Sequence, residues 1–261
     1  MTRSQFFRLI AWSAAAGAWS SRGVASPKAG SRFSAVAFDG FPIFDPRPVA
    51  KVAEELYPGR GGDLVAAWRT RQFEYQWLRA LGGQYADFWA TTADGLDFAA
   101  RQLRLDLTPQ ARDRLMSLFA ALPIWPDVKP ALGALKQAGL RLAILSNMTP
   151  KMLDGGIRAA GLTGAFEHIL STDRLKTYKP DPRAYEMGTQ ALGLPREEIL
   201  FAAFAGWDAA GARWFGYPTF WVNRLGQPED ALGASPDGSG AGLSELVEFV
   251  ARRNQAGHVE P

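Results

Sequence analysis

After Ser31 the hydrophobic pattern begins with the segment FSAVAFD at residues 33–39, whose apolar run stops abruptly at Asp39. A short continuous apolar run is typical of a strand that is buried on both faces of a parallel sheet. Over residues 48–122 the large apolar side chains recur instead at helical steps, as at Trp68, Tyr75 and Leu78, and no convincing strand interrupts them. We therefore expect one buried strand followed by a long helical segment.

Strands and helices alternate in the rest of the chain. The apolar runs that predict strands are LRLAIL, HIL, ILFAAF and PTFWV. Between and after them, helical spacing, Gly and Pro predict helices over 128–137, from 150, from 182, over 207–215 and over 243–252. This alternation indicates βαβ units that build a parallel sheet.

These patterns predict an α/β fold, a Rossmann-like parallel sheet core with an inserted all-helical cap. The core is expected to comprise residues 33–47 and 123–253, and the cap residues 48–122. Residues 226–242 are rich in Gly, Pro, Ser and Asp, so an exposed loop is expected there. Residues 254–261 are expected to form a polar C-terminal tail.

Composition narrows the possible chemistry. The chain has 261 residues, 47% of them hydrophobic, which suffices to bury a substantial core. Its net charge is only +3 and its Lys and Arg residues are scattered, so no nucleic-acid partner is indicated. The absence of Cys excludes disulfides, Cys-ligated zinc and thiolate nucleophiles. Two histidines, His168 and His258, are too few for a multi-histidine metal site, and we interpret His168 as structural.

The first 25 residues have the features of an export signal. Arg3 and Arg8 precede an apolar run at residues 9–19, and small residues follow before Ser26. The run is shorter than the roughly 20 apolar residues that span a bilayer, so a stable membrane anchor is not expected. The start resembles a twin-arginine export motif with Ser4 in place of the second arginine, which leaves the export route open. We predict a periplasmic or secreted protein, with an unprocessed cytoplasmic leader as the alternative.

Polar side chains follow the predicted strands at the points where the strands end. They are Asp39, the pair Ser146 and Asn147, Lys179 and Asp208. Ligands of open parallel sheets bind at the carboxyl ends of the strands, so we expect these side chains to share one crevice. Taken singly, each has a structural alternative: an Asp after a strand can close a turn, and a Ser-Asn pair can cap a helix.

Four segments carry a resemblance to a known family: LAILSN, KTYKPDPRAYE, WDAAGARWFGYPTFWVNR and the cap segment AAWRTRQFEYQWLRALGGQYADFW. With them, the chain resembles type II haloacid dehalogenases of the haloacid dehalogenase superfamily from about residue 33 to residue 250. The resemblance implies that Asp39 attacks the halogen-bearing carbon of a short 2-haloacid and forms an ester that water hydrolyses. It also implies that no cofactor or metal takes part, and it suggests a homodimer.

The resemblance assigns roles to the other strand-end residues. Arg69 matches the cap arginine that receives the departing halide, which suits a guanidinium that keeps its charge. Ser146 and Asn147 match the pair that holds the substrate carboxylate. Lys179 is expected to keep the nucleophile ionised, and Asp208 to pair with Lys179 and to orient or activate the hydrolytic water.

Further positions match the substrate pocket of the family. Tyr185 is expected to form a hydrogen bond in the pocket. Phe41, Phe73, Phe88 and Trp207 fall where the family has an apolar lining, although each could equally belong to an ordinary core.

Magnesium-dependent phosphatases of the same superfamily are a poorer match. They usually carry a second Asp two positions after the nucleophile, and this chain has Phe41 there. They also carry further acids in the last motif, where Asp208 is followed by Ala209, Ala210 and Gly211. Mg²⁺ prefers several oxygen ligands, so phosphoryl transfer is disfavoured.

Two departures from the dehalogenase pattern leave two hypotheses open. The loop after Asp39 is one residue shorter than in the family, lacks its Thr and contains Pro42, which has no backbone donor. Ala203 and Ala205 occupy the positions of a Ser and an Asn that hold the lysine, the acid and the water. Losing such a donor costs about 2.7–4 kcal/mol. The chain is either a divergent 2-haloacid dehalogenase or a noncatalytic or weakly catalytic binding protein for a small carboxylate.

Overall fold

The described part of the computed structural model, residues 32–256, contains one six-stranded parallel sheet, and the predicted export signal lies outside it. The strand order is β3-β2-β1-β4-β5-β6. The strands are β1 (Ala35–Phe38), β2 (Arg141–Ser146), β3 (His168–Ser171), β4 (Ile199–Ala203), β5 (Thr219–Val222) and β6 (Gly238–Gly240).

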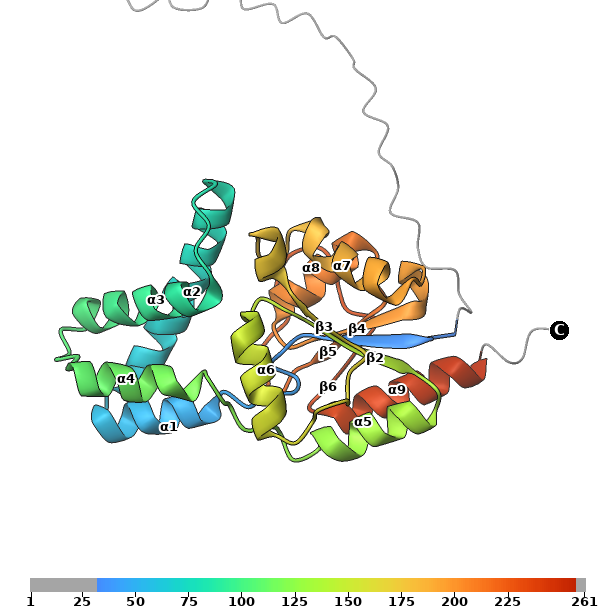
Figure 1. The fold of residues 1–261 in the computed structure, drawn as a ribbon, viewed down its shortest axis with the longest axis horizontal. Coiled ribbons are helices and arrows are strands. Elements are labelled where there is room, and N and C mark those ends of the chain that lie inside the picture. The colour runs from blue at the N-terminus through green and yellow to red at the C-terminus, as the bar shows by residue number, and fades with distance from the viewer. Residues whose placement is uncertain (1–31, 257–261) are drawn as a thin grey trace, which may run out of the picture.

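Helices cover both faces of the sheet because successive strand residues point to opposite sides. In β1, Val36 and Phe38 belong to one apolar cluster, whereas Ala35 and Ala37 belong to the other. The first cluster packs against α5 (Val128–Gln137), α6 (Pro150–Ala159) and α9 (Leu243–Ala256). The second cluster packs against α7 (Pro182–Leu192) and α8 (Gly206–Phe215). Figure 1 shows α5 and α9 below the sheet and α7 and α8 above it. The predicted α/β class is confirmed.

A group of helices inserted between β1 and α5 stands beside the sheet (Figure 1). It consists of α1 (Arg47–Leu56), α2 (Gly61–Leu81), α3 (Phe88–Gln102) and α4 (Pro109–Leu118). The chain enters and leaves this insert through two adjacent segments, with Phe44 bridging Ile124 and the Asp45 amide donating to the Pro123 carbonyl at 2.7 Å. The insert is therefore attached to the sheet by a paired, two-stranded connection.

Three details differ from the sequence-based expectations. The expected loop at 226–242 contains β6, which pairs in parallel with β5. Helix α9 continues to Ala256, four residues beyond the predicted end, and residues 257–261 lie outside the described part. The Nε2 atom of His168 has no hydrogen-bond partner and lies 3.4 Å from a Glu167 carboxylate oxygen, whereas a structural histidine was expected to be hydrogen-bonded. Within residues 32–256 we find no helix with the length and apolarity that crossing a membrane requires.

Candidate active site

The register of the sheet brings the ends of β1, β2 and β4 together. Phe38 pairs with Ile144 on one side and with Ala202 on the other, and the Asp39 amide extends the ladder by donating to the Ala202 carbonyl at 2.9 Å. Asp39 therefore leaves the sheet at the middle of its carboxyl edge. Asp208 approaches from the first turn of α8.

A buried cluster of three charges lies at this edge. The Lys179 Nζ donates to Asp39 Oδ1 at 2.8 Å and to Asp208 Oδ2 at 2.6 Å. The side chains of Lys179 and Asp208 are only 1% and 2% exposed. Because isolated buried charges are very unfavourable, the cluster is stable only while the ammonium lies between the two carboxylates and balances them. The three residues come from separate segments of the chain and meet here, as the strand-end pattern predicts.

The cluster perturbs the pKa values of its members. Burial alone would lower the pKa of Lys179, but the adjacent charges of Asp208 and Asp39 outweigh burial and raise it, so the ammonium stays protonated. Burial raises the pKa of Asp208 to about 6, with a further contribution from the charge of Asp39, while Lys179 opposes the shift. Asp208 therefore changes its protonation state nearer to neutral pH than an ordinary carboxyl group does.

Tyr185, on α7, contacts the cluster through Asp208. Its side chain is fully buried, and its hydroxyl donates to Asp208 Oδ1 at 2.7 Å. Burial raises the pKa of Tyr185 well above its ordinary value, so the phenol remains a donor. Gly211 permits this contact, because a Cβ there would lie 2.5 Å from the Tyr185 oxygen. Tyr185 is not among the residues that line the cavity described next, so the structure places it behind Asp208 and not against a substrate.

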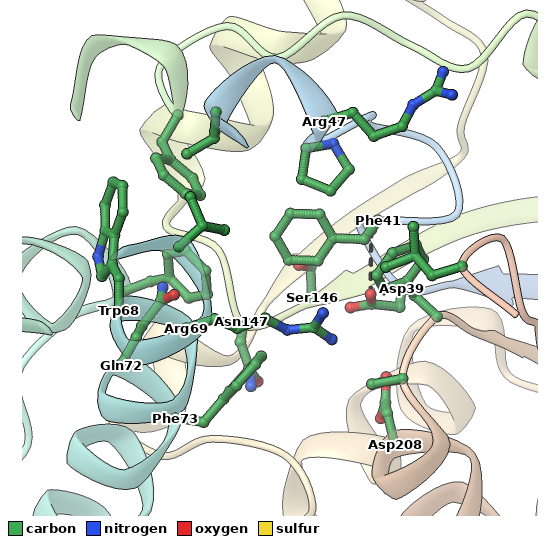
Figure 2. Close-up of a pocket in the computed structure, with 18 of the residues that line it drawn as sticks. Asp39, Phe41, Arg47, Trp68, Arg69, Gln72, Phe73, Ser146, Asn147 and Asp208 are labelled. Carbon is green, nitrogen blue, oxygen red and sulfur yellow. Dashed lines mark hydrogen bonds between the residues drawn. The ribbon is translucent and has the colours of Figure 1, made fainter. Parts of the chain in front are cut away.

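A cavity of about 230 Å³ lies between the sheet edge and the helical insert. Asp39 and Asp208 form part of its wall, and Figure 2 shows the guanidinium of Arg69 extending from α2 toward Asp39. The predicted apolar lining residues Phe41, Phe73, Phe88 and Trp207 all face this cavity, as do Arg69, Ser146 and Asn147. Lys179 does not line the cavity, because the carboxylates of Asp39 and Asp208 cover it.

Arg69 is a cation without a carboxylate partner among the described residues. Its guanidinium carbon lies 5.8 Å from the centre of the Phe73 ring. Nearby protein atoms lower the pKa of Arg69 by desolvation, although the residue as a whole is exposed. An unpaired guanidinium in an apolar cavity is suited to bind an anion.

Ser146 and Asn147 lie where β2 ends. The Ser146 Oγ accepts from the Met148 amide at 3.2 Å, which leaves its proton free to be donated. The Asn147 Oδ1 accepts from the Lys179 amide at 2.9 Å, so its side chain holds the lysine loop. Gly40 allows the two strand ends to approach, because a Cβ at that position would lie 2.9 Å from Ser146 Oγ.

The two alanines that replace family donors differ in their surroundings. Ala203 is completely buried inside the core, whereas Ala205 lines the cavity. Between them Phe204 also faces the cavity, with its ring 5.7 Å from that of Phe41. The wall near Asp208 is therefore apolar where the family has an amide.

Two tryptophans that the sequence did not single out hold the loops of the site. The indole Nε1 of Trp77, on α2, donates to the Lys179 carbonyl at 3.1 Å and so ties the insert to the lysine loop. The Nε1 of Trp125 donates to the Phe41 carbonyl at 2.9 Å, and guanidinium groups of Arg47 and Arg224 lie 4.4 Å and 4.5 Å from its ring centre. These contacts fix the short loop after Asp39. The only sequence signal for Trp77 was its position four residues after Phe73.

Residues 32–256 contain no group of three or more His, Asp or Glu side chains arranged to hold a metal ion. Asp39 and Asp208 instead share one lysine, and Phe41 takes the place in which a phosphatase would carry its second acid. The charged groups at this edge are thus two carboxylates balanced by one ammonium.

Comparisons with known proteins agree with this geometry. A family model described as haloacid dehalogenase-like hydrolase matches residues 15–216. The chain is 44% identical to an (S)-2-haloacid dehalogenase of Pseudomonas sp. (strain YL) over 82% of its length and 93% of that protein's. It is 40% identical to haloacetate dehalogenase H-2 of Moraxella sp. (strain B), covering 84% of this chain and 99% of that one.

Solved structures show the same similarity. The L-2-haloacid dehalogenase of Xanthobacter autotrophicus with chloropropionic acid covalently bound is 33% identical, with a TM-score of 0.77 over 84% of this chain and 98% of that one. Another L-2-haloacid dehalogenase is 42% identical, with a TM-score of 0.83 over 85% of this chain and 100% of that one. The chain belongs to the haloacid dehalogenase-like hydrolases and, within them, to the L-2-haloacid dehalogenase family.

Proposed function

We propose that this protein is a 2-haloacid dehalogenase that displaces halide from a 2-haloalkanoic acid through an ester on Asp39. The observation that carries the proposal is the pairing, across one apolar cavity, of a lysine-held carboxylate with an arginine that has no acidic partner among residues 32–256. The covalently bound chloropropionic acid in the Xanthobacter relative supports a covalent intermediate.

In the first step a carboxylate oxygen of Asp39 forms a bond to C2 of the substrate. The carbon–halogen bond breaks, and the halide leaves with its electron pair toward Arg69. The hydroxyl of Ser146 and the backbone near Asn147 hold the substrate carboxylate. Asp39 is already aimed, because its Oδ1 accepts from Lys179 and its Oδ2 accepts from the Phe41 amide at 3.2 Å. Such positioning can supply about 7–11 kcal/mol of the barrier.

In the second step water attacks the carbonyl carbon of the ester. Asp208 accepts a proton from this water, and cleavage of the acyl–oxygen bond releases the 2-hydroxy acid and regenerates Asp39. Lys179 stabilises the negative charge that develops on the carbonyl oxygen, since it lies within hydrogen-bond distance of Asp39. The sum of the two steps consumes one water and releases one halide and one proton.

The test combines halide release with intact mass spectrometry. The mature chain is incubated with 2-chloropropionate, chloride is quantified, and the peptide that contains Asp39 is examined for an adduct. We expect chloride release with wild type and neither release nor adduct with Asp39→Asn. Chloride release that persists in Asp39→Asn would contradict the proposed nucleophile.

A second candidate function follows from one observation, the loss of family donors at Ala203 and Ala205. Without them ester hydrolysis could be so slow that the protein acts as a binding or trapping protein for a small carboxylate. In that case wild type forms a stoichiometric adduct without turnover, or it is stabilised thermally by 2-haloacids to the same extent as Asp39→Asn. Sustained chloride release well above one equivalent argues against this candidate.

We further infer that the protein is exported and forms a homodimer. The charged, apolar and small-residue sections of residues 1–25 support export, and amino-terminal sequencing of the periplasmic or secreted protein tests it. Leu78 and Leu81 near the end of α2 are 63% and 87% exposed, which supports an apolar contact there. Sedimentation analysis of wild type and of a Leu81→Glu variant tests the dimer.

A further inference from the structure

We propose that the cavity contains an apolar arm that binds the C2 substituent of 2-haloalkanoic acids of five or six carbons in preference to shorter ones. The arm is formed by Val49 and Ala50 of α1, Val65 and Trp68 of α2, and Phe119 after α4. The inference rests on the proposed function, because it identifies the class of 2-haloacid that the site takes.

The arm is continuous with the reaction centre. The residues that form it line the same cavity as Asp39, Arg69 and Ser146. Figure 2 shows Trp68 on the wall opposite Asp39, with the ring of Phe41 between them. A substrate whose carboxylate lies at Ser146 and whose halogen lies at Arg69 therefore directs its remaining substituent past the ring of Phe41 toward the insert.

The arm offers little to a polar substituent. The indole Nε1 of Trp68 is already committed to the Thr92 carbonyl at 2.6 Å, and the amide nitrogen of neighbouring Gln72 to the Thr92 hydroxyl at 2.5 Å. The cationic end of Arg47 forms a double hydrogen bond to Asp45, and so its charge is balanced. An alkyl chain suits these walls because the Trp68 indole, the Gln72 amide nitrogen and the Arg47 charge already have partners.

The size of the cavity sets the length of that chain. An apolar cavity of about 150 Å³ holds benzene, which corresponds to roughly 25 Å³ for each of its heavy atoms. On the same scale the 230 Å³ cavity holds about nine heavy atoms. 2-Chloropropionate has six heavy atoms and leaves about a third of this space empty, whereas 2-chlorohexanoate has nine.

The test is the chain-length dependence of kcat/KM for 2-chloropropionate, 2-chlorobutanoate and 2-chlorohexanoate. A fully buried methylene is expected to raise kcat/KM about fourfold, mainly through KM, because ground state and transition state gain equally. Val65→Phe and Ala50→Phe each fill the arm, and either is expected to reduce the preference for hexanoate over propionate by tenfold or more. Ala251→Phe, on an exposed position of α9, is the matched control and is expected to keep the wild-type preference.

Binding measurements on Asp39→Asn test the arm independently of turnover. We expect 2-chlorohexanoate to stabilise this variant against heat at lower concentrations than 2-chloropropionate does, and Val65→Phe to remove the difference. Equal or weaker effects of the longer acid in both assays would overturn the arm while leaving the proposed function intact if propionate is dehalogenated. Absence of chloride release from every acid, together with chain-length-dependent binding, would instead overturn the proposed function and support the arm.

Discussion

Replacing Tyr185 with Phe should shift the pH dependence of ester hydrolysis, because Tyr185 stabilises the charged form of Asp208. Its hydroxyl donates to Asp208 Oδ1 at 2.7 Å, while Lys179 occupies the other carboxylate oxygen. The phenol lacks access to the cavity, so the substitution leaves the substrate contacts unchanged. Its effect on catalysis must therefore pass through Asp208.

The size of the shift follows from the strength of the lost hydrogen bond. A hydrogen bond to a charged group contributes about 1.5–3 kcal/mol. Each pKa unit corresponds to 1.36 kcal/mol, so the pKa of Asp208 should rise by roughly one to two units. The pKa of Asp208 is about 6 in the free protein and lies lower in the ester, where the charge of Asp39 is absent. The acidic limb of ester decay should therefore move upward by roughly one to two pH units in the variant, and its rate at pH 9 should equal that of wild type.

Single-turnover mass spectrometry measures this directly, because the decay of the adduct on Asp39 reports hydrolysis without the alkylation step. Tyr217→Phe is the matched control: it also deletes a buried phenol hydroxyl, which donates to the Tyr185 carbonyl at 2.8 Å and not to Asp208. The reasoning is refuted if the acidic limb of ester decay is the same in Tyr185→Phe as in wild type. Equal shifts in both variants would also refute it, since a general loosening of the core would then suffice.

Three further predictions concern the same cluster. Lys179→Met should lower the free energy of unfolding by about 3–5 kcal/mol at pH 7, because it leaves two buried carboxylates uncompensated. Urea unfolding should show a smaller loss at pH 5. A loss below about 1 kcal/mol at pH 7 would contradict the buried pairing. The pKa of Asp208 is raised from 3.8 to about 6, so between these pH values the folded protein retains a proton that the unfolded chain releases. The contribution of Asp208 to stability should therefore fall as pH rises from about 4 to 6. Urea titrations of Asp208→Asn should lack this dependence. Ala205→Asn should accelerate decay of the ester tenfold or more by restoring a donor at the cavity wall, and Ala205→Leu, which adds a similar volume without a donor, should not.

The residues at the carboxyl edge of the sheet could be predicted from the sequence, because the apolar segments before them allow few arrangements. A continuous apolar run such as the one that ends at Asp39 must be a doubly buried strand, and parallel strands joined by helices must place their ends along one edge. The sequence could therefore predict that Asp39, Ser146 and Asp208 lie near one another. The contacts of Lys179 with both carboxylates then follow from the high cost of leaving any of the three unpaired.

Strand β6 was missed for an equally physical reason. Two of its three residues are Gly, a residue depleted in strands, and its surroundings are rich in turn formers. It is a strand because the exposed edge of β5 offers backbone partners, not because its own side chains favour extension. Pairing of this kind depends on which edge is free after the rest of the sheet has formed, and local composition carries no record of it.

The tryptophan contacts and the position of Tyr185 were out of reach for a related reason. The indoles of Trp77 and Trp125 donate to backbone carbonyls of Lys179 and Phe41, and every residue offers such a carbonyl. An apolar pattern reports that a ring is buried, but it does not report which carbonyl faces its nitrogen. Likewise, the family motif placed Tyr185 at the site without saying that it approaches Asp208 from behind.

The charge balance of the cluster connects the two steps of the proposed reaction. In the free protein two carboxylates share one ammonium, and the negative charge of Asp39 adds to burial in raising the pKa of Asp208. When Asp39 becomes an ester its charge disappears, so the repulsion on Asp208 ends while the attraction of Lys179 remains. The pKa of Asp208 must then fall, and the group becomes ionised at the stage at which it has to accept a proton from water. Formation of the ester thus prepares the base that removes it, because it removes the negative charge of Asp39.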